Sequence, residues 1–145
     1  MRLASLTTCA ALIAASRAIA CSCVIGSAAD YYGRSDDVFT ARVISVKSAA
    51  ISLDDQKFPG KHVTLRVIGS LKGGKRAGHT EVRDTYDDQG LCGVPVKVGD
   101  EVLVYSSRRF PRAFGRCDTR FGSKMAADLT ELKRNRVTNP ADKGP

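Results

Sequence analysis

The alternation of hydrophobic and polar positions predicts about five β-strands. In the segment 62–68, Val63, Leu65 and Val67 face one way and polar residues face the other, as in a strand that is buried on one side. The segment 38–46 is rich in β-formers with apolar residues on both faces. The predicted strands are 38–46, 62–68, 79–86, 101–105 and a last strand through Cys117, and residues 51–60 are predicted to be a loop.

Two short helices are predicted at the ends of this strand-rich region. Ser27 is a favourable N-cap with an acid three residues later at Asp30, and Gly33 can end the first helix. A final helix is indicated by apolar residues that share one face, namely Met125, Leu129 and Leu132. Residues 136–145 are predicted to be a disordered tail.

These elements define an all-β class with short helices. The strands do not alternate with helices, so a parallel βαβ sheet is not expected. Residues 21–135 suffice for one domain with a single core. A closed five-stranded Greek-key barrel of the OB type is one architecture that fits, and a small sandwich is the other.

The first 20 residues have the pattern of a secretory signal. Arg2 provides a short basic region, residues 3–16 are almost uncharged, and Ala18-Ile19-Ala20 fits the small-x-small cleavage rule. Cleavage there makes Cys21 the first residue of a secreted protein, or of a periplasmic one in a Gram-negative cell. The alternative is a lipoprotein signal, in which Cys21 would be acylated, but the polar Arg17 suits it poorly. No later segment is apolar and long enough for a membrane span.

The chain is basic, with a formal net charge of +8 that falls to +6 once Arg2 and Arg17 leave with the signal. Such a protein can contact anionic surfaces, although a solvated surface is the simpler interpretation. Two basic clusters stand out: Lys72, Lys75 and Arg76, and a loop in which Arg108, Arg109, Arg112 and Arg116 surround Phe110 and Phe114. The loop resembles a site for single-stranded nucleic acid, but export argues against nucleic acid.

Four cysteines remain after the signal and its Cys9 are removed: Cys21, Cys23, Cys92 and Cys117. An even number in a small exported domain indicates two disulfides. A Cys21–Cys23 bridge would close a very tight ring and is disfavoured by disulfide geometry. The two other pairings both remain open at this point. A four-cysteine zinc site is disfavoured by the C-x-C spacing and by an oxidising compartment.

Several of these segments together resemble the N-terminal domain of the tissue inhibitors of metalloproteinases, a branch of the netrin-like domains. Signal cleavage leaves C-S-C at the N-terminus, as in that family. The stretches "SDDVFTARVISV" (35–46) and "LCGVPVKVGDEVLVY" (91–105) are similar to the family's first strand and to the region of the cysteine that bonds the N-terminal residue. The resemblance covers residues 21–122 and lacks the family's cysteine-rich C-terminal domain.

The resemblance implies a fold, a disulfide pattern and an activity. The fold is a five-stranded OB barrel, and the disulfides are Cys21–Cys92 and Cys23–Cys117. The α-amine and carbonyl of Cys21 would chelate the catalytic zinc of a target metalloproteinase, with the Ser22 side chain in its specificity pocket. The inhibitory ridge would consist of Cys21, Ser22, Cys23, Val24, Ile25, Gly90 and Leu91.

Other candidate residues carry weaker signals. His62 and His79 have no serine or acidic constellation in the sequence and are interpreted as surface residues. The adjacent acids Asp87 and Asp88 are weak evidence for a cation site. We therefore expect a monomeric, non-enzymatic protein without a cofactor of its own. Two functions are considered: inhibition of a zinc metalloproteinase, and an exported module that binds an anionic polymer or a protein partner.

Overall fold

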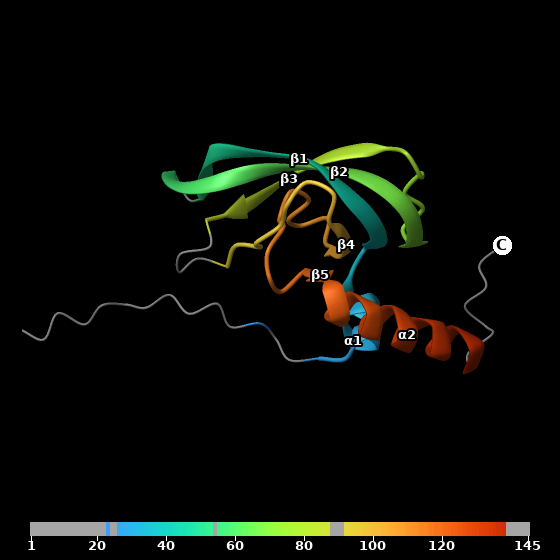
Figure 1. The fold of residues 1–145 in the computed structure, drawn as a ribbon. Helices are drawn as coiled ribbons and strands as arrows, with labels where there is room; N and C mark the ends of the chain where they lie inside the picture. The colour runs from blue at the N-terminus through green and yellow to red at the C-terminus, as the bar shows by residue number, and fades with distance from the viewer. Residues whose placement is uncertain (1–22, 24–25, 54, 88–91, 139–145) are drawn as a thin grey trace, which may run out of the picture.

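Five antiparallel strands and two helices make up the described part of the chain (Figure 1). In the computed structural model, the described residues are 23, 26–53, 55–87 and 92–138. The elements in chain order are α1 (Ala28–Arg34), β1 (Asp37–Leu53), β2 (Gln56–Lys72), β3 (Thr80–Tyr86), β4 (Glu101–Ser106), β5 (Thr119–Phe121) and α2 (Gly122–Thr138). The prediction of about five strands and two helices is confirmed at this level.

The strands form one sheet in the order β3-β2-β1-β4-β5, built around a long β1–β2 hairpin. Leu53 pairs with Gln56, so only two residues separate the two strands, and Asp55 has the positive φ of 63° that such tight turns require. The predicted loop over 51–60 is therefore wrong. Its turn-forming residues Pro59 and Gly60 pair within the hairpin instead, opposite Ala50 and Ala49.

The curved sheet meets the loop after β4 at one point on β3. Asp84 forms a parallel bridge with Ala113. The Asp84 amide donates to the carbonyl of Arg112 at 2.7 Å, and the Phe114 amide donates to the carbonyl of Asp84 at 3.0 Å. The segment 112–114 thus covers part of an edge strand whose backbone groups would otherwise lack partners in the sheet.

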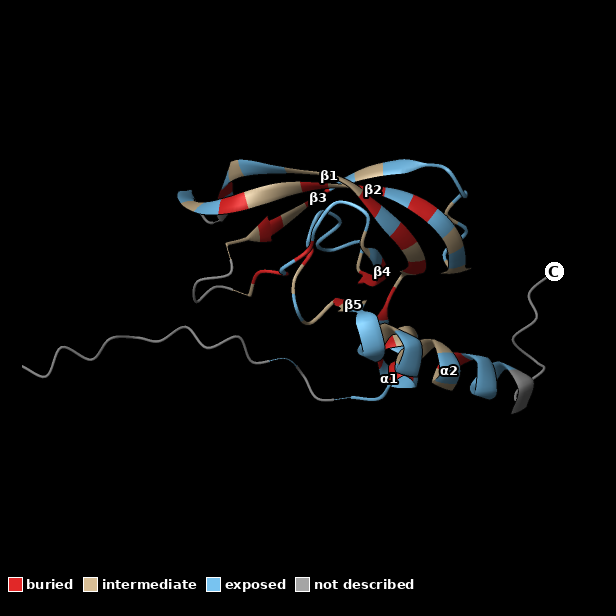
Figure 2. Cartoon of the chain, viewed as in Figure 1, coloured by how far each residue is buried: buried red, intermediate tan, exposed pale blue. Residues whose placement is uncertain are grey.

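Strand β4 and the beginning of β1 are buried on both faces, because the sheet there separates two hydrophobic clusters (Figure 2). The larger cluster fills the concave side and includes Phe39, Val63, Leu65, Val67, Val94, Val102, Val104 and Phe114. The smaller cluster packs Val38, Leu103 and Tyr105 against the helices through Tyr31, Met125 and Leu129. The alternation predicted for 62–68 and the apolar face of the final helix are both confirmed.

The two helices pack together below β5 (Figure 1). Ser27 and Asp30 form the predicted capping box, with the Asp30 amide donating to Ser27 Oγ at 3.1 Å. Helix α1 continues through Gly33 to Arg34, so the predicted stop at Gly33 is wrong. Within the described part of the chain, no helix is long and apolar enough to cross a membrane.

The C-terminal part of the sequence prediction needs two corrections. The last strand begins at Thr119, after Cys117 rather than through it. Helix α2 extends to Thr138, into the range predicted as a tail, and residues 139–145 lie outside the described residues. Arg136 accounts for part of this extension, since its guanidinium donates to the Leu71 carbonyl at the end of β2.

A buried arginine on β3 joins opposite strands of the curved sheet. The Arg83 side chain is only 3% exposed. Its guanidinium donates to Glu81 Oε2 at 3.0 and 2.5 Å and to Ser106 Oγ on β4 at 3.0 Å. It also lies 5.5 Å from the ring centroid of Phe39 on β1. Because all three contacts come from different strands, Arg83 connects β3, β4 and β1 from the inside.

Replacing this arginine tests that connection. We expect Arg83→Ala to lower the free energy of unfolding by about 3–5 kcal/mol, because it leaves buried polar groups without their partner. Arg42→Ala is the matched control. Arg42 pairs with Glu101 at 2.5 Å, but the two side chains are 57% and 47% exposed, so about 0–1 kcal/mol is expected. Urea unfolding followed by circular dichroism measures both; equal losses would contradict the role assigned to Arg83.

Candidate functional site

The predicted inhibitory ridge lies almost entirely outside the described residues. Cys23 is its only described member. The residues outside the described part are Cys21, Ser22, Val24, Ile25, Gly90 and Leu91. The structure does describe three cysteines that attach this region to the rest of the protein, namely Cys23, Cys92 and Cys117.

Cys23 is bonded to Cys117, the residue two positions before β5. The two Cα atoms are 5.2 Å apart although 94 residues separate them in the chain. This is one of the pairings that the resemblance implies. The Cys21–Cys23 and Cys23–Cys92 alternatives are excluded by it. The disulfide holds the chain just after the predicted cleavage site against the body of the protein.

Cys92 lies close to the same place. It is also disulfide-bonded, and its predicted partner, Cys21, is outside the described residues. Its carbonyl accepts the Arg116 amide at 3.1 Å, one residue before Cys117. Gly93 packs its backbone on the end of β3, where a Cβ would collide with the carbonyl oxygen of Tyr86. Only glycine permits this approach, so residue 93 fixes the position of its neighbour Cys92.

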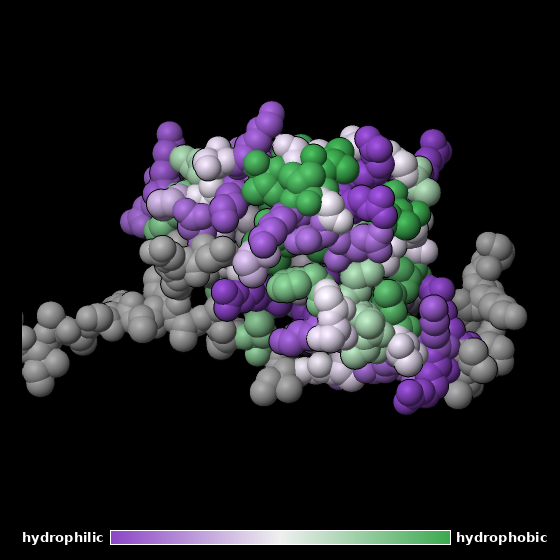
Figure 3. All heavy atoms as spheres, viewed as in Figure 1, coloured by the Kyte–Doolittle hydropathy of each residue, from purple (hydrophilic) through white to green (hydrophobic). Residues whose placement is uncertain are grey.

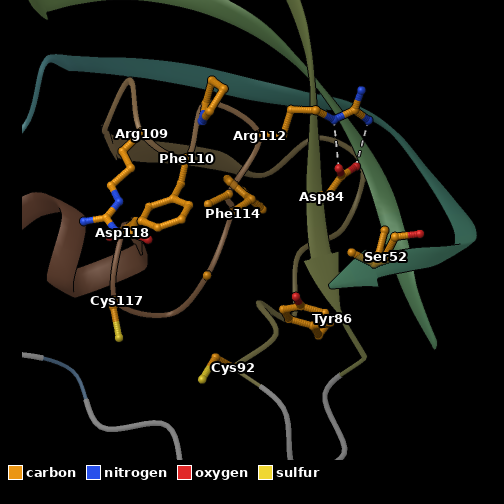
Figure 4. Close-up of a pocket in the computed structure, with 14 residues that line it drawn as sticks. Ser52, Asp84, Tyr86, Cys92, Arg109, Phe110, Arg112, Phe114, Cys117 and Asp118 are labelled. Atoms are coloured by element: carbon orange, nitrogen blue, oxygen red, sulfur yellow. Dashed lines mark hydrogen bonds and ion pairs between the residues drawn. The ribbon is translucent and has the colours of Figure 1, made fainter. Parts of the chain in front are cut away.

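A pocket of about 560 Å³ opens beside these two cysteines. Both Cys92 and Cys117 line it (Figure 4). Its other walls are Ile51 and Ser52 of β1, Asp84 and Tyr86 of β3, and the loop residues Arg109 to Gly115 with Asp118. Its volume is within the range of about 300–1,000 Å³ that is usual for small-molecule sites. Sequence reasoning missed this pocket, because its walls come together only when the loop after β4 reaches β3.

At one end of the pocket, Asp84 holds two basic side chains. Arg112 donates to both carboxylate oxygens at 2.8 and 2.9 Å, and His62 Nδ1 is 2.7 Å from Oδ1. The His62 side chain is 43% exposed, in line with its interpretation as a surface residue, but strand pairing places an acidic partner, Asp84, opposite it that the sequence did not reveal. Within the described residues, no hydroxyl or thiol side chain is bonded to His62. The group thus has the geometry of a structural ion cluster.

Most residues of the two predicted basic clusters have internal partners. Lys72 donates to the carbonyls of Tyr32 and Gly33 at the end of α1, and Lys75 is bonded to Glu81. In the arginine-rich loop, Arg116 donates to the Gly93 carbonyl at 2.9 Å. Figure 3 shows hydrophilic and apolar surface intermixed on the face that it presents.

Metal ligands do not cluster in the described residues. No group of three or more His, Cys, Asp or Glu side chains that could hold an ion is found among them. Of the two acids predicted as a weak cation site, Asp88 lies outside the described residues, and Asp87 pairs with Lys61 at 3.4 Å.

Comparison with known proteins adds no family assignment. No protein-family model matches the chain, and no curated protein matches it.

The Asp84 cluster generates a prediction about acid stability. Burial of Asp84 opposes its ionisation, but the hydrogen bonds and charges of Arg112 and His62 outweigh burial and hold its pKa below the ordinary value. A depressed carboxyl pKa stabilises the fold above the unfolded-state pKa of about 3.9, and this stability is lost as pH falls through the lower folded-state value. Asp84→Asn should therefore destabilise the protein at pH 6 and much less at pH 2.

Urea midpoints measured from pH 6 to pH 2 on wild type and Asp84→Asn check this. Asp87→Asn, which removes an acid from a longer and more exposed ion pair, is the control. The cluster would lose its assigned role if the difference between wild type and Asp84→Asn were independent of pH.

Proposed function

We propose that the chain is an exported netrin-like OB barrel that inhibits a zinc metalloproteinase through the α-amine and carbonyl of Cys21. The observation that carries this proposal is the Cys23–Cys117 disulfide. It fixes the chain two residues from the proposed N-terminus, where an unattached end would be mobile. A rigid terminus loses less entropy on binding, which is what a chelating N-terminus needs.

The barrel assignment is supported by the contact between β3 and the segment 112–114. An antiparallel sheet that ends in a parallel contact between its third strand and a later segment is consistent with a closed barrel of this type. The position of Cys92 adds to the argument. Cys92 is held beside Cys117 by the hydrogen bond between its carbonyl and the Arg116 amide, and its proposed partner stands two residues before Cys23 in the sequence.

The chemistry follows from the coordination of zinc. A catalytic zinc keeps one open position that is normally held by water. The amine nitrogen and carbonyl oxygen of one residue form a five-membered chelate that displaces this water. The amine binds only when neutral, and an α-amine has an ordinary pKa of about 8. Affinity should therefore rise with pH up to about 8 and then level off, as the free amine loses its proton.

The first measurement is the intact mass and the N-terminal sequence of the exported protein. The proposal requires Cys21 as the first residue and a mass four hydrogens below the reduced value, for two disulfides. A retained leader, an acylated Cys21 or unpaired thiols would remove the zinc-directed amine and exclude the mechanism.

The second measurement is inhibition of a panel of zinc metalloproteinases. One extra alanine before Cys21 should weaken inhibition at least about 100-fold, because it replaces the chelating amine by an amide; this corresponds to about 2.7 kcal/mol. The matched control has the extra alanine after Pro145 and should inhibit like the native protein. Equal inhibition by both forms would contradict the chelate, and binding that is indifferent to the amine but falls with salt would favour an anionic partner.

A further inference from the structure

The pocket beside Cys92 and Cys117 combines aromatic walls with one carboxylate that has no bonding partner among the described residues. Figure 4 shows Phe110, Phe114 and Tyr86 around the pocket, with Phe114 between the other two in this view. Phe110 is 61% exposed, although it is large and apolar. An exposed aromatic side chain at the wall of a pocket is available to a ligand without any rearrangement of the core.

The charged side chains on the pocket wall differ in whether they already have a partner. Asp84 and Arg112 neutralise each other through two hydrogen bonds. The Arg109 guanidinium lies 5.3 Å from the ring centroid of Phe110, which shows that this ring already accepts a cation on a face. The Asp118 carboxylate remains, and within the described residues its side chain makes no hydrogen bond and no ion pair.

The Asp118 carboxylate is partly buried, and within the described residues no group donates a hydrogen bond to it. Burial raises the pKa of its carboxyl, against the opposing charges of Arg120 and Arg34. Both arginines are engaged with other groups. Arg120 pairs with Asp128 at 3.3 Å, and Arg34 lies 3.9 Å from the ring centroid of Tyr31. A partly desolvated carboxylate without a donor is unfavourable, and a ligand that brings a cationic donor relieves this.

We propose that this pocket binds a small organic ammonium ion with an apolar or aromatic body. The body lies against Phe110 and Tyr86, and the ammonium group donates to Asp118. Ring faces attract ammonium groups through their quadrupole, and a carboxylate adds a charged acceptor, so the two features favour the same ligand class. The site is independent of the Cys21 amine and of any protease partner.

Three probes of matched shape test the ligand class at pH 7 by titration calorimetry: phenethylamine, 2-phenylethanol and 3-phenylpropionate. We expect the amine to bind about tenfold or more tightly than the alcohol, with the acid weakest. The proposal is overturned if none of the three binds at millimolar concentration or if the acid binds best.

Two variants and their controls assign the contacts. Asp118→Asn should reduce the affinity for the amine to that for the alcohol and leave the alcohol unchanged. Phe110→Ala should weaken the amine and the alcohol alike. The controls are Asp87→Asn, which also removes one acid, and Phe121→Ala, which removes a 40% exposed phenylalanine outside the pocket. An amine affinity that is the same in wild type and Asp118→Asn would refute the assignment.

A pH series on the wild type gives a second readout that needs no variant. The charged groups near Asp118 are Arg34 of α1, Arg120 of β5 and Arg109 of its own loop, with the Tyr105 hydroxyl of β4. The raised pKa of Asp118 means that its carboxylate is lost first as pH falls. The amine should therefore bind more weakly at pH 4 than at pH 7, while the alcohol should not change. A pH-independent amine affinity would overturn the proposal.

Discussion

The contact between β3 and the segment 112–114 is the constraint on which the rest of the structure depends. Two backbone hydrogen bonds at Asp84 and a bidentate ion pair with Arg112 join the third strand to a loop nearly thirty residues later. This contact covers part of a sheet edge and brings Phe114 into the core. Without it, the concave face of the sheet would lose one of its largest buried side chains, and the loop after β4 would have no fixed position.

The loop after β4 also positions the residues on which both proposals depend. It leads directly into Cys117, so the disulfide to Cys23 is attached to a segment already fixed at Asp84. It supplies Arg116, whose amide reaches the Cys92 carbonyl, and most of the walls of the pocket. The Cys23–Cys117 disulfide and the proposed ammonium site therefore share the segment around Cys117, although the two proposals use different residues and can be tested separately.

Sequence predictions that rest on residues close together in the chain are confirmed, whereas those that depend on contacts between distant residues are wrong or incomplete. The Ser27–Asp30 capping box and the alternation of Val63, Leu65 and Val67 are local patterns, and both are confirmed. The loop predicted over 51–60 is wrong because Pro59 and Gly60 usually interrupt strands, yet here they pair across a long hairpin. His62 acquires Asp84 only through the pairing of β2 with β3, which no local pattern specifies.

The sequence by itself determined the strand-rich class, the capped first helix, the apolar face of the last one and the presence of cysteines placed for disulfides. These are fixed by side-chain periodicity and by residue types that act within a few positions. Only the tertiary structure decided which cysteine pairs with Cys23, that Asp84 joins three segments, and that a pocket lined by Asp118 forms beside Cys117. Each of these depends on contacts between residues about 20 or more positions apart. The register of the strands and the packing of the loops bring these residues together.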